Sequence, residues 1–249
     1  MNGDSSVDRT VKTIRFFRSL LSGAFFFAYG AFALPFAVLL LLPWPSGFVR
    51  PFVRWFYRGF VFLAAVTGLY RVSLSREDRT LLKHLKGAVV VMNHISLIDI
   101  CIIFAYLGDS TAIAKAAAKR NPFLALTVKR MFLVNDADPA ATIAEAKRLL
   151  SKGVNIVVFP QGTRGGTKWH RGAARIALAA GAKIQPVRIA YDPIVLAKGQ
   201  PWWDVGEKVI RISLKSAPEI AFDLPDDHRS AVVLTEWIEN SLELKSRVL

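Results

Sequence analysis

The sequence predicts an α/β fold with a mostly parallel sheet flanked by helices, preceded by an N-terminal membrane-embedded helix or helical hairpin. From about Arg71 onward, short apolar runs rich in β-branched residues alternate with helical stretches that end at glycine. This alternation is typical of a parallel sheet with crossover helices. Before that point the chain has a long uncharged segment, and about 20 apolar residues are enough to cross a bilayer.

The elements of the predicted sheet domain follow from these runs. Five strands are predicted: Ala88 to Met92, Met131 to Asn135, Val154 to Phe159, Ile184 to Ala190 and Val209 to Leu214. Four helices are predicted: Ile98 to Leu107, Pro139 to Lys152, Gly172 to Ala180 and Arg229 to Leu244. The second helix has a strong start signal, because Asp138 is a good cap and Pro139 suits the first helical turn.

The N-terminal segment carries no charge between Arg18 and Arg50. Basic residues flank both of its ends, so the distribution of charge gives no orientation, and Pro35 can bend the segment back on itself. We predict that residues 1–70 form a membrane-attachment region with both ends near the cytoplasm, and that residues 71–249 form the second domain. One plain spanning helix is the alternative. A second, interfacial helix is predicted from Phe56 to Tyr70.

Composition points to an anionic partner. The formal net charge is +14, which suits nucleic acid, an acidic membrane surface or an acidic protein. The mean hydropathy of +0.34 favours the membrane, because a nucleic-acid binder is seldom so apolar. The single cysteine, Cys101, excludes an internal disulfide and a Cys-rich zinc site, and it fits a reducing compartment.

A histidine and an aspartate follow the first predicted strand. His94 and Asp99 are five residues apart, and on a regular helix they would point roughly 140° away from each other. They can meet only if His94 lies in the turn before a helix, and the capping-box-like pair Ser96 and Asp99 places Asp99 in the first helical turn. A carboxylate on one ring nitrogen leaves the other free to take a proton. The pair therefore predicts a general-base dyad, with a capping aspartate beside a solvated histidine as the alternative.

A second polar loop, Phe159 to Arg164, also follows an apolar run. Gly162 lets the backbone approach a ligand, exposed amides can hold an anion, and Arg164 offers a planar fork for phosphate. A plain turn with a solvated arginine is the alternative. Because the loops at the carboxyl ends of parallel strands border one crevice, we expect the two loops to face the same site.

Together these segments resemble the lysophospholipid acyltransferase family, whose best-known members are the 1-acylglycerol-3-phosphate acyltransferases. The family's Asn-His, four residues, Asp motif matches Asn93, His94 and Asp99, and its Phe-Pro-Glu-Gly-Thr-Arg motif matches residues 159–164 except at Gln161. Its proline among β-branched residues resembles residues 184–187. A looser block begins at Ala114 and Lys115. The resemblance covers roughly residues 88–190.

The resemblance implies an O-acyltransferase whose catalytic domain is residues 71–249. In such an enzyme His94 deprotonates the hydroxyl of a lyso-lipid, which attacks the thioester of acyl-CoA or acyl carrier protein without a covalent acyl-enzyme. No cofactor beyond this donor and no metal are expected. The residues implied to bind substrate, beside the catalytic His94 and Asp99, are Asn93, Lys115, Gln161, Gly162, Thr163 and Arg164. We expect an oxyanion to be held by amides near Gly162 or at the start of the helix after His94.

The acceptor is expected to be 1-acylglycerol-3-phosphate, giving phosphatidic acid. Because the sequence departs from the family pattern at two positions, the alternative acceptor is another lyso-lipid, such as a lyso-ornithine lipid or one with a glycolipid-like head group. Gln161 replaces a glutamate and Asp136 stands where an arginine is usual, so the predicted phosphate pocket is weakened unless Lys115, Arg130 or Arg164 compensates.

The partners follow from this interpretation: the membrane bilayer, the lyso-lipid acceptor and the acyl donor, and no nucleic acid. We place the protein at a membrane, on the cytoplasmic face of a bacterial inner membrane. A basic-aromatic run, Lys168 to Arg171, is interpreted as attracting anionic lipid or an acidic acyl carrier protein. The distant alternative is a membrane-tethered nucleic-acid-binding protein that uses this run, but it leaves both motifs unexplained.

Overall fold

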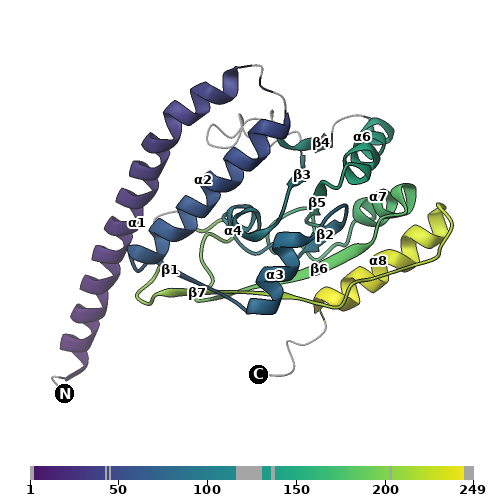
Figure 1. The fold of residues 1–249 in the computed structure, drawn as a ribbon. Helices are drawn as coiled ribbons and strands as arrows, with labels where there is room; N and C mark the ends of the chain where they lie inside the picture. Colours follow the sequence, from purple (N-terminus) through teal and green to yellow (C-terminus); the bar gives the residue numbers. More distant parts are fainter. Residues whose placement is uncertain are drawn as a thin grey trace.

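A computed structural model describes residues 3–42, 44, 46–115, 131–135, 138–201 and 204–243. These residues form a seven-stranded sheet in the order β1-β7-β6-β2-β5-β3-β4, with helices on both faces (Figure 1). The strands are β1 Tyr70–Leu74, β2 Val89–Met92, β3 Ser110–Lys115, β4 Leu133–Asn135, β5 Asn155–Val158, β6 Ile184–Asp192 and β7 Ile210–Ser216. The described helices are α1 Gly3–Leu41, α2 Ser46–Val66, α3 Arg76–His84, α4 Asp99–Tyr106, α6 Pro139–Ser151, α7 Gly172–Ala180 and α8 His228–Glu243.

The sheet is mostly parallel, as predicted. All neighbouring strands run parallel except β6 and β7, which are antiparallel. The five predicted strands and four predicted helices are present with small shifts at their ends. β1, β3 and α3 were not predicted from the sequence. β1 is an edge strand with alternating exposure, and β3 includes the buried polar residues Ser110 and Thr111, so neither reads as an apolar run.

The central strand β2 supplies side chains to both layers of the core. Val89 and Val91 pack in the layer beneath α6, α7 and α8, whereas Val90 and Met92 pack in the layer that contains residues of α2, α3 and α4. All four side chains have no exposed surface, as expected for a parallel strand covered by helices on both faces. The end of β2 therefore holds the loop that follows it in a rigid place.

The N-terminal region forms a helical hairpin. α1 continues through position 35 to Leu41 and α2 begins at Ser46, so the hairpin does not divide at Pro35, where the sequence allowed a bend. The predicted interfacial helix falls mostly within α2, which begins earlier, at Ser46, and ends at Val66. α2 packs on the sheet domain through buried side chains of the same core layer as α4, including Val53 and Tyr57.

The uncharged interval between Arg18 and Arg50 is divided between α1 and α2. Among the residues that the structure describes, no helix combines the length and the apolar character needed to cross a membrane. The membrane-embedded segment, like its alternative of one plain spanning helix, stays a prediction. The division into residues 1–70 and 71–249 stays a prediction.

Candidate active site

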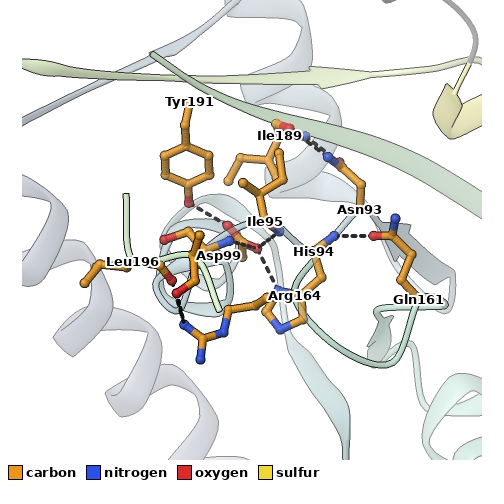
Figure 2. A network of polar contacts seen from close by, with 11 residues as sticks. Asn93, His94, Ile95, Asp99, Gln161, Arg164, Ile189, Tyr191 and Leu196 are labelled. Atoms are coloured by element: carbon orange, nitrogen blue, oxygen red, sulfur yellow. Dashed lines mark hydrogen bonds and ion pairs between the residues drawn. The ribbon is translucent and has the colours of Figure 1, made fainter. Parts of the chain in front are cut away.

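His94 lies in the turn between β2, which ends at Met92, and α4, which begins at Asp99. Its Nδ1 is 2.7 Å from Oδ2 of Asp99 (Figure 2). The predicted contact is therefore present, and it arises for the predicted reason, because Asp99 is in the first turn of the helix. Since a carboxylate only accepts hydrogen bonds, Nδ1 is the donor, and in the neutral ring the lone pair is then on Nε2.

The Asp99 carboxylate is fully buried and accepts several hydrogen bonds. Its Oδ2 also accepts the backbone N–H groups of Ile95, at 2.7 Å, and Ser96, at 2.9 Å. Its Oδ1 accepts the hydroxyl of Tyr191 at 2.6 Å. A buried carboxylate is tolerated only with such partners. Ser96 was expected to cap the helix, but the N-cap position is Ile98 and the side chain that closes the turn is that of Asp99.

Tyr191 is a site residue that the sequence analysis missed. It lies on β6 and reaches Asp99 from the strand next to β2 (Figure 2). Burial, and then the neighbouring Asp99 carboxylate, raises the pKa of Tyr191 well above its ordinary value, so the hydroxyl stays protonated and donates. The sequence contains a pattern that could have identified this residue. Tyr191 follows Val187 and Ile189 at every second position of β6, and these side chains are all buried.

The main chain of His94 is held by the second motif loop. Its N–H donates to Oε1 of Gln161 at 2.8 Å, and its carbonyl oxygen accepts the N–H of Gly165 at 2.9 Å. Gly165 has a φ of +64°, a conformation that favours glycine. Gln161 thus positions the histidine turn. A glutamate oxygen could accept the same bond, so the departure from the family pattern at position 161 is compatible with this contact.

The imidazole of His94 faces a large cavity. Phe159 stacks on the ring, with centroids 4.4 Å apart, and 22% of the His94 side chain is exposed. Nε2 has no hydrogen-bond partner within the described part of the chain. The cavity has a volume of about 1020 Å³ and is lined by residues of the His94 turn, β3, β5, α6, α7 and α8. The free ring nitrogen can therefore meet a ligand.

Arg164 holds the loop that follows β6. Its guanidinium donates from one nitrogen to the carbonyl oxygens of Leu196, at 2.6 Å, and Ala197, at 3.3 Å. Leu196 has a φ of +55°, and its carbonyl oxygen also accepts the N–H of Leu97 at 3.2 Å. Because a guanidinium has five N–H donors in a fork, this anchoring leaves donors for a ligand.

The remaining predicted substrate residues are placed differently. Both polar groups of the Asn93 side chain bond to the main chain of Ile189, each at 2.8 Å, so Asn93 ties the end of β2 to β6. The N–H of Gly162 donates to the carbonyl oxygen of Phe159, which closes a turn. Thr163 is exposed. Lys115 ends β3 and its side chain lies outside the described residues, as do Arg130 and Asp136 altogether.

The amides expected to hold an oxyanion are partly occupied. The N–H groups of Gly162, Ile95 and Ser96 all donate within the protein. The next amides along the second loop, those of Thr163 and Arg164, have no acceptor among the described residues. They are the better candidates for this role.

The other side chains near His94 and Asp99 that could act as nucleophiles are poorly placed to do so. Cys101 packs against the core, and burial raises the pKa of its thiol to about 12. The side chain of Ser96 has no exposed surface. Over the described ranges, no group of three or more His, Cys, Asp or Glu side chains could hold a metal ion. Of His94, Ser96 and Cys101, only His94 lines the cavity.

Comparison with known proteins agrees with this picture. A family model described as Acyltransferase matches residues 73–190. The chain is 36% identical over 124 residues to a 1-acyl-sn-glycerol-3-phosphate acyltransferase of Helicobacter pylori, covering 45% of this chain and 52% of that protein. It is 31% identical over 115 residues to an enzyme of the same name from Borreliella burgdorferi, covering 42% and 46%. The matches thus span about half the length of these curated relatives.

A solved structure shares the fold. The crystal structure of the 1-acyl-sn-glycerophosphate (LPA) acyltransferase PlsC from Thermotoga maritima matches with a TM-score of 0.69 and 21% identity, covering 94% of this chain and 99% of that one. The resemblance inferred from the motifs is confirmed by these matches. The roles of the individual site residues stay predictions.

Proposed function

We propose that this protein is an O-acyltransferase that moves a fatty acyl group from a thioester to the hydroxyl of a lyso-lipid, because residues 73–190 match the family model described as Acyltransferase. The observation that carries the proposal is the His94 imidazole, which is held by Asp99 on one side and faces the cavity on the other. This is the arrangement that a general base requires.

The reaction follows from that geometry. Asp99 fixes the tautomer, so Nε2 of His94 takes the proton of the acceptor hydroxyl as its oxygen attacks the thioester carbonyl. The amides of Thr163 and Arg164 would hold the oxyanion of the tetrahedral intermediate. Collapse breaks the carbon–sulfur bond, and the leaving thiolate takes the proton from the imidazolium. No covalent acyl-enzyme is needed, which suits a site where Cys101 is kept protonated by burial.

We take 1-acylglycerol-3-phosphate as the acceptor, because both curated relatives are named for it. The N–H groups of Arg164 that have no acceptor among the described residues support a phosphate-bearing acceptor, although Arg164 itself does not line the cavity. A lyso-ornithine lipid or a glycolipid-like acceptor remains the alternative, since Asp136, the departure that would weaken a phosphate pocket, lies outside the described residues.

A panel of acceptors tests the proposal. Labelled acyl-CoA and acyl carrier protein thioesters are supplied with lyso-lipids that carry or lack a phosphate, and kcat/KM is measured for each. We expect a preference for lysophosphatidate of about tenfold or more, the effect of roughly 1.4 kcal/mol. Arg164→Lys keeps the charge but not the fork, and it should lower this preference.

Two results would contradict parts of this proposal. A higher kcat/KM for phosphate-free lyso-lipids would favour the alternative acceptor. Absence of transfer to any hydroxyl acceptor, from either donor, would remove the acyltransferase assignment itself.

The helical hairpin is proposed to attach the protein to the membrane surface. Large apolar side chains are exposed along both helices and the link between them: Ile14, Phe16, Phe17, Leu20, Leu21, Phe27, Phe32, Leu42, Trp44, Phe48, Trp55, Phe62, Leu63 and Val66. Exposed apolar surface of this extent, accompanied by basic residues, is typical of interfacial helices. The cytoplasmic face of a bacterial inner membrane stays the predicted location.

Vesicle binding tests this attachment. The protein should sediment with vesicles of anionic phospholipid and stay bound in high salt. Phe27→Asp combined with Phe48→Asp should weaken binding, because each places a charge on a strongly exposed apolar position of one hairpin helix. Trp237→Asp, at an exposed apolar position on α8, is the matched control. Complete release by salt alone would show that the basic surface, and not the apolar one, holds the protein.

A further inference from the structure

The cavity that contains the His94 ring extends to the first turns of α7 and α8. There it is lined by two arginines and two histidines, His170, Arg171, Arg175 and His228. We call these four residues, whose positive charge comes from Arg171 and Arg175, the cationic cluster. The guanidinium of Arg171 donates to Nε2 of His228, which ties the starts of α7 and α8 together.

The charges around the cluster leave its arginines available. Asp226 and Asp227 also line this part of the cavity. Oδ1 of Asp227 accepts the N–H of Ser230 at 2.7 Å, and this backbone hydrogen bond lowers the pKa of that carboxyl, which fits a carboxylate that caps α8. Arg171 and Arg175 are exposed, and within the described part of the chain neither forms a salt bridge. Two guanidinium forks beside a cavity suit a phosphate group.

The position of the cluster indicates which substrate brings that phosphate. α2 packs in the core layer on one face of the sheet, whereas α7 and α8 pack in the layer on the other face (Figure 1). The hairpin, which carries the exposed apolar surface, therefore lies across the sheet from the cluster. The proposed attachment of the hairpin to the membrane would bring a lipid acceptor from the hairpin side. The substrate that approaches from the cluster side is the water-soluble one.

We propose that the cationic cluster binds the phosphate at the far end of the donor's pantetheine arm, so that the arm lies along the cavity and its thioester reaches His94. This inference rests on the proposed function. Coenzyme A and the prosthetic group of acyl carrier protein share this chemistry, a thiol on pantetheine with a phosphate at the opposite end. The same cluster therefore serves either donor.

Binding and kinetics with phosphate-bearing and phosphate-free ligands test the assignment. In Arg171→Gln with Arg175→Gln, we expect the Kd for coenzyme A and the KM for acyl-CoA to rise about tenfold or more. The Kd for pantetheine, the kinetics with acyl-pantetheine and the KM for lysophosphatidate should stay unchanged. Arg211→Gln with Lys215→Gln removes the same charge from exposed positions of β7 that do not line the cavity, and it should change none of these values.

The outcomes separate this inference from the proposed function. Unchanged binding of coenzyme A in the cluster variant, or an equal loss in the control variant, would overturn the donor assignment. A rise in the KM for lysophosphatidate alone would assign the phosphate to the acceptor instead. If the wild type binds coenzyme A through the cluster but transfers no acyl group, the site stands and the proposed reaction fails. Melting curves of both variants check that folding is intact.

Discussion

His94→Ala is expected to abolish acyl transfer, lowering kcat by about 10³-fold or more, because it removes the imidazole that Asp99 orients and that takes the proton of the acceptor hydroxyl. The fold should be retained. The contacts that hold the turn, to Gln161 and Gly165, are made by the main chain of His94 and survive the substitution. Rates are measured with acyl-CoA and the preferred acceptor, and folding by thermal unfolding.

His84→Ala is the matched control. His84 is exposed on α3, where its Nδ1 lies 2.9 Å from the carbonyl oxygen of Thr80, and it does not line the cavity. We expect this variant to keep the wild-type rate. Near wild-type turnover in His94→Ala would exclude the general-base role.

Asp99→Asn is expected to lower kcat by about 10³- to 10⁴-fold, the effect seen when a carboxylate that orients a catalytic histidine is replaced by its amide. The amide can present a donor to Nδ1, which favours the wrong tautomer. The same change leaves buried donors poorly paired, at a cost of about 1–3 kcal/mol in the free energy of unfolding. Kinetics and denaturant unfolding of the purified variant measure the two effects separately.

Tyr191→Phe gives a graded comparison. It removes one donor from Oδ1 but leaves the carboxylate and its contacts with His94, Ile95 and Ser96. Its loss of kcat should be much smaller than that of Asp99→Asn. If Asp99→Asn instead loses stability without losing kcat, Asp99 is only a structural cap for the turn.

The sequence predicted the contacts that depend on local geometry. His94 and Asp99 meet because a strand ends just before one and a helix begins at the other, and both boundaries can be read from the apolar pattern and the turn residues. The mostly parallel sheet follows in the same way from the alternation of strands and helices. The helical hairpin could be anticipated from the uncharged interval, although α1 continues through Pro35, the residue at which a bend was allowed.

The contacts that depend on strand order could not be predicted. Tyr191 reaches Asp99 only because β6 lies beside β2, and Gln161 reaches His94 only because β5 lies on the other side. No local pattern specifies which strands are neighbours. The antiparallel direction of β7 could not be predicted for the same reason. Nor could the sequence predict that the arginines of α7 and the histidine of α8 line one cavity.

The place of β2 between β5 and β6 also governs when the site forms during folding. The contact between His94 and Asp99 spans five residues, whereas those from Gln161 and Tyr191 span 67 and 92. Long-range parallel pairings close large loops and form slowly. The turn that carries the histidine can therefore take shape early, but it becomes rigid only after both neighbouring strands have docked, so the working site is among the last parts of the domain to be completed.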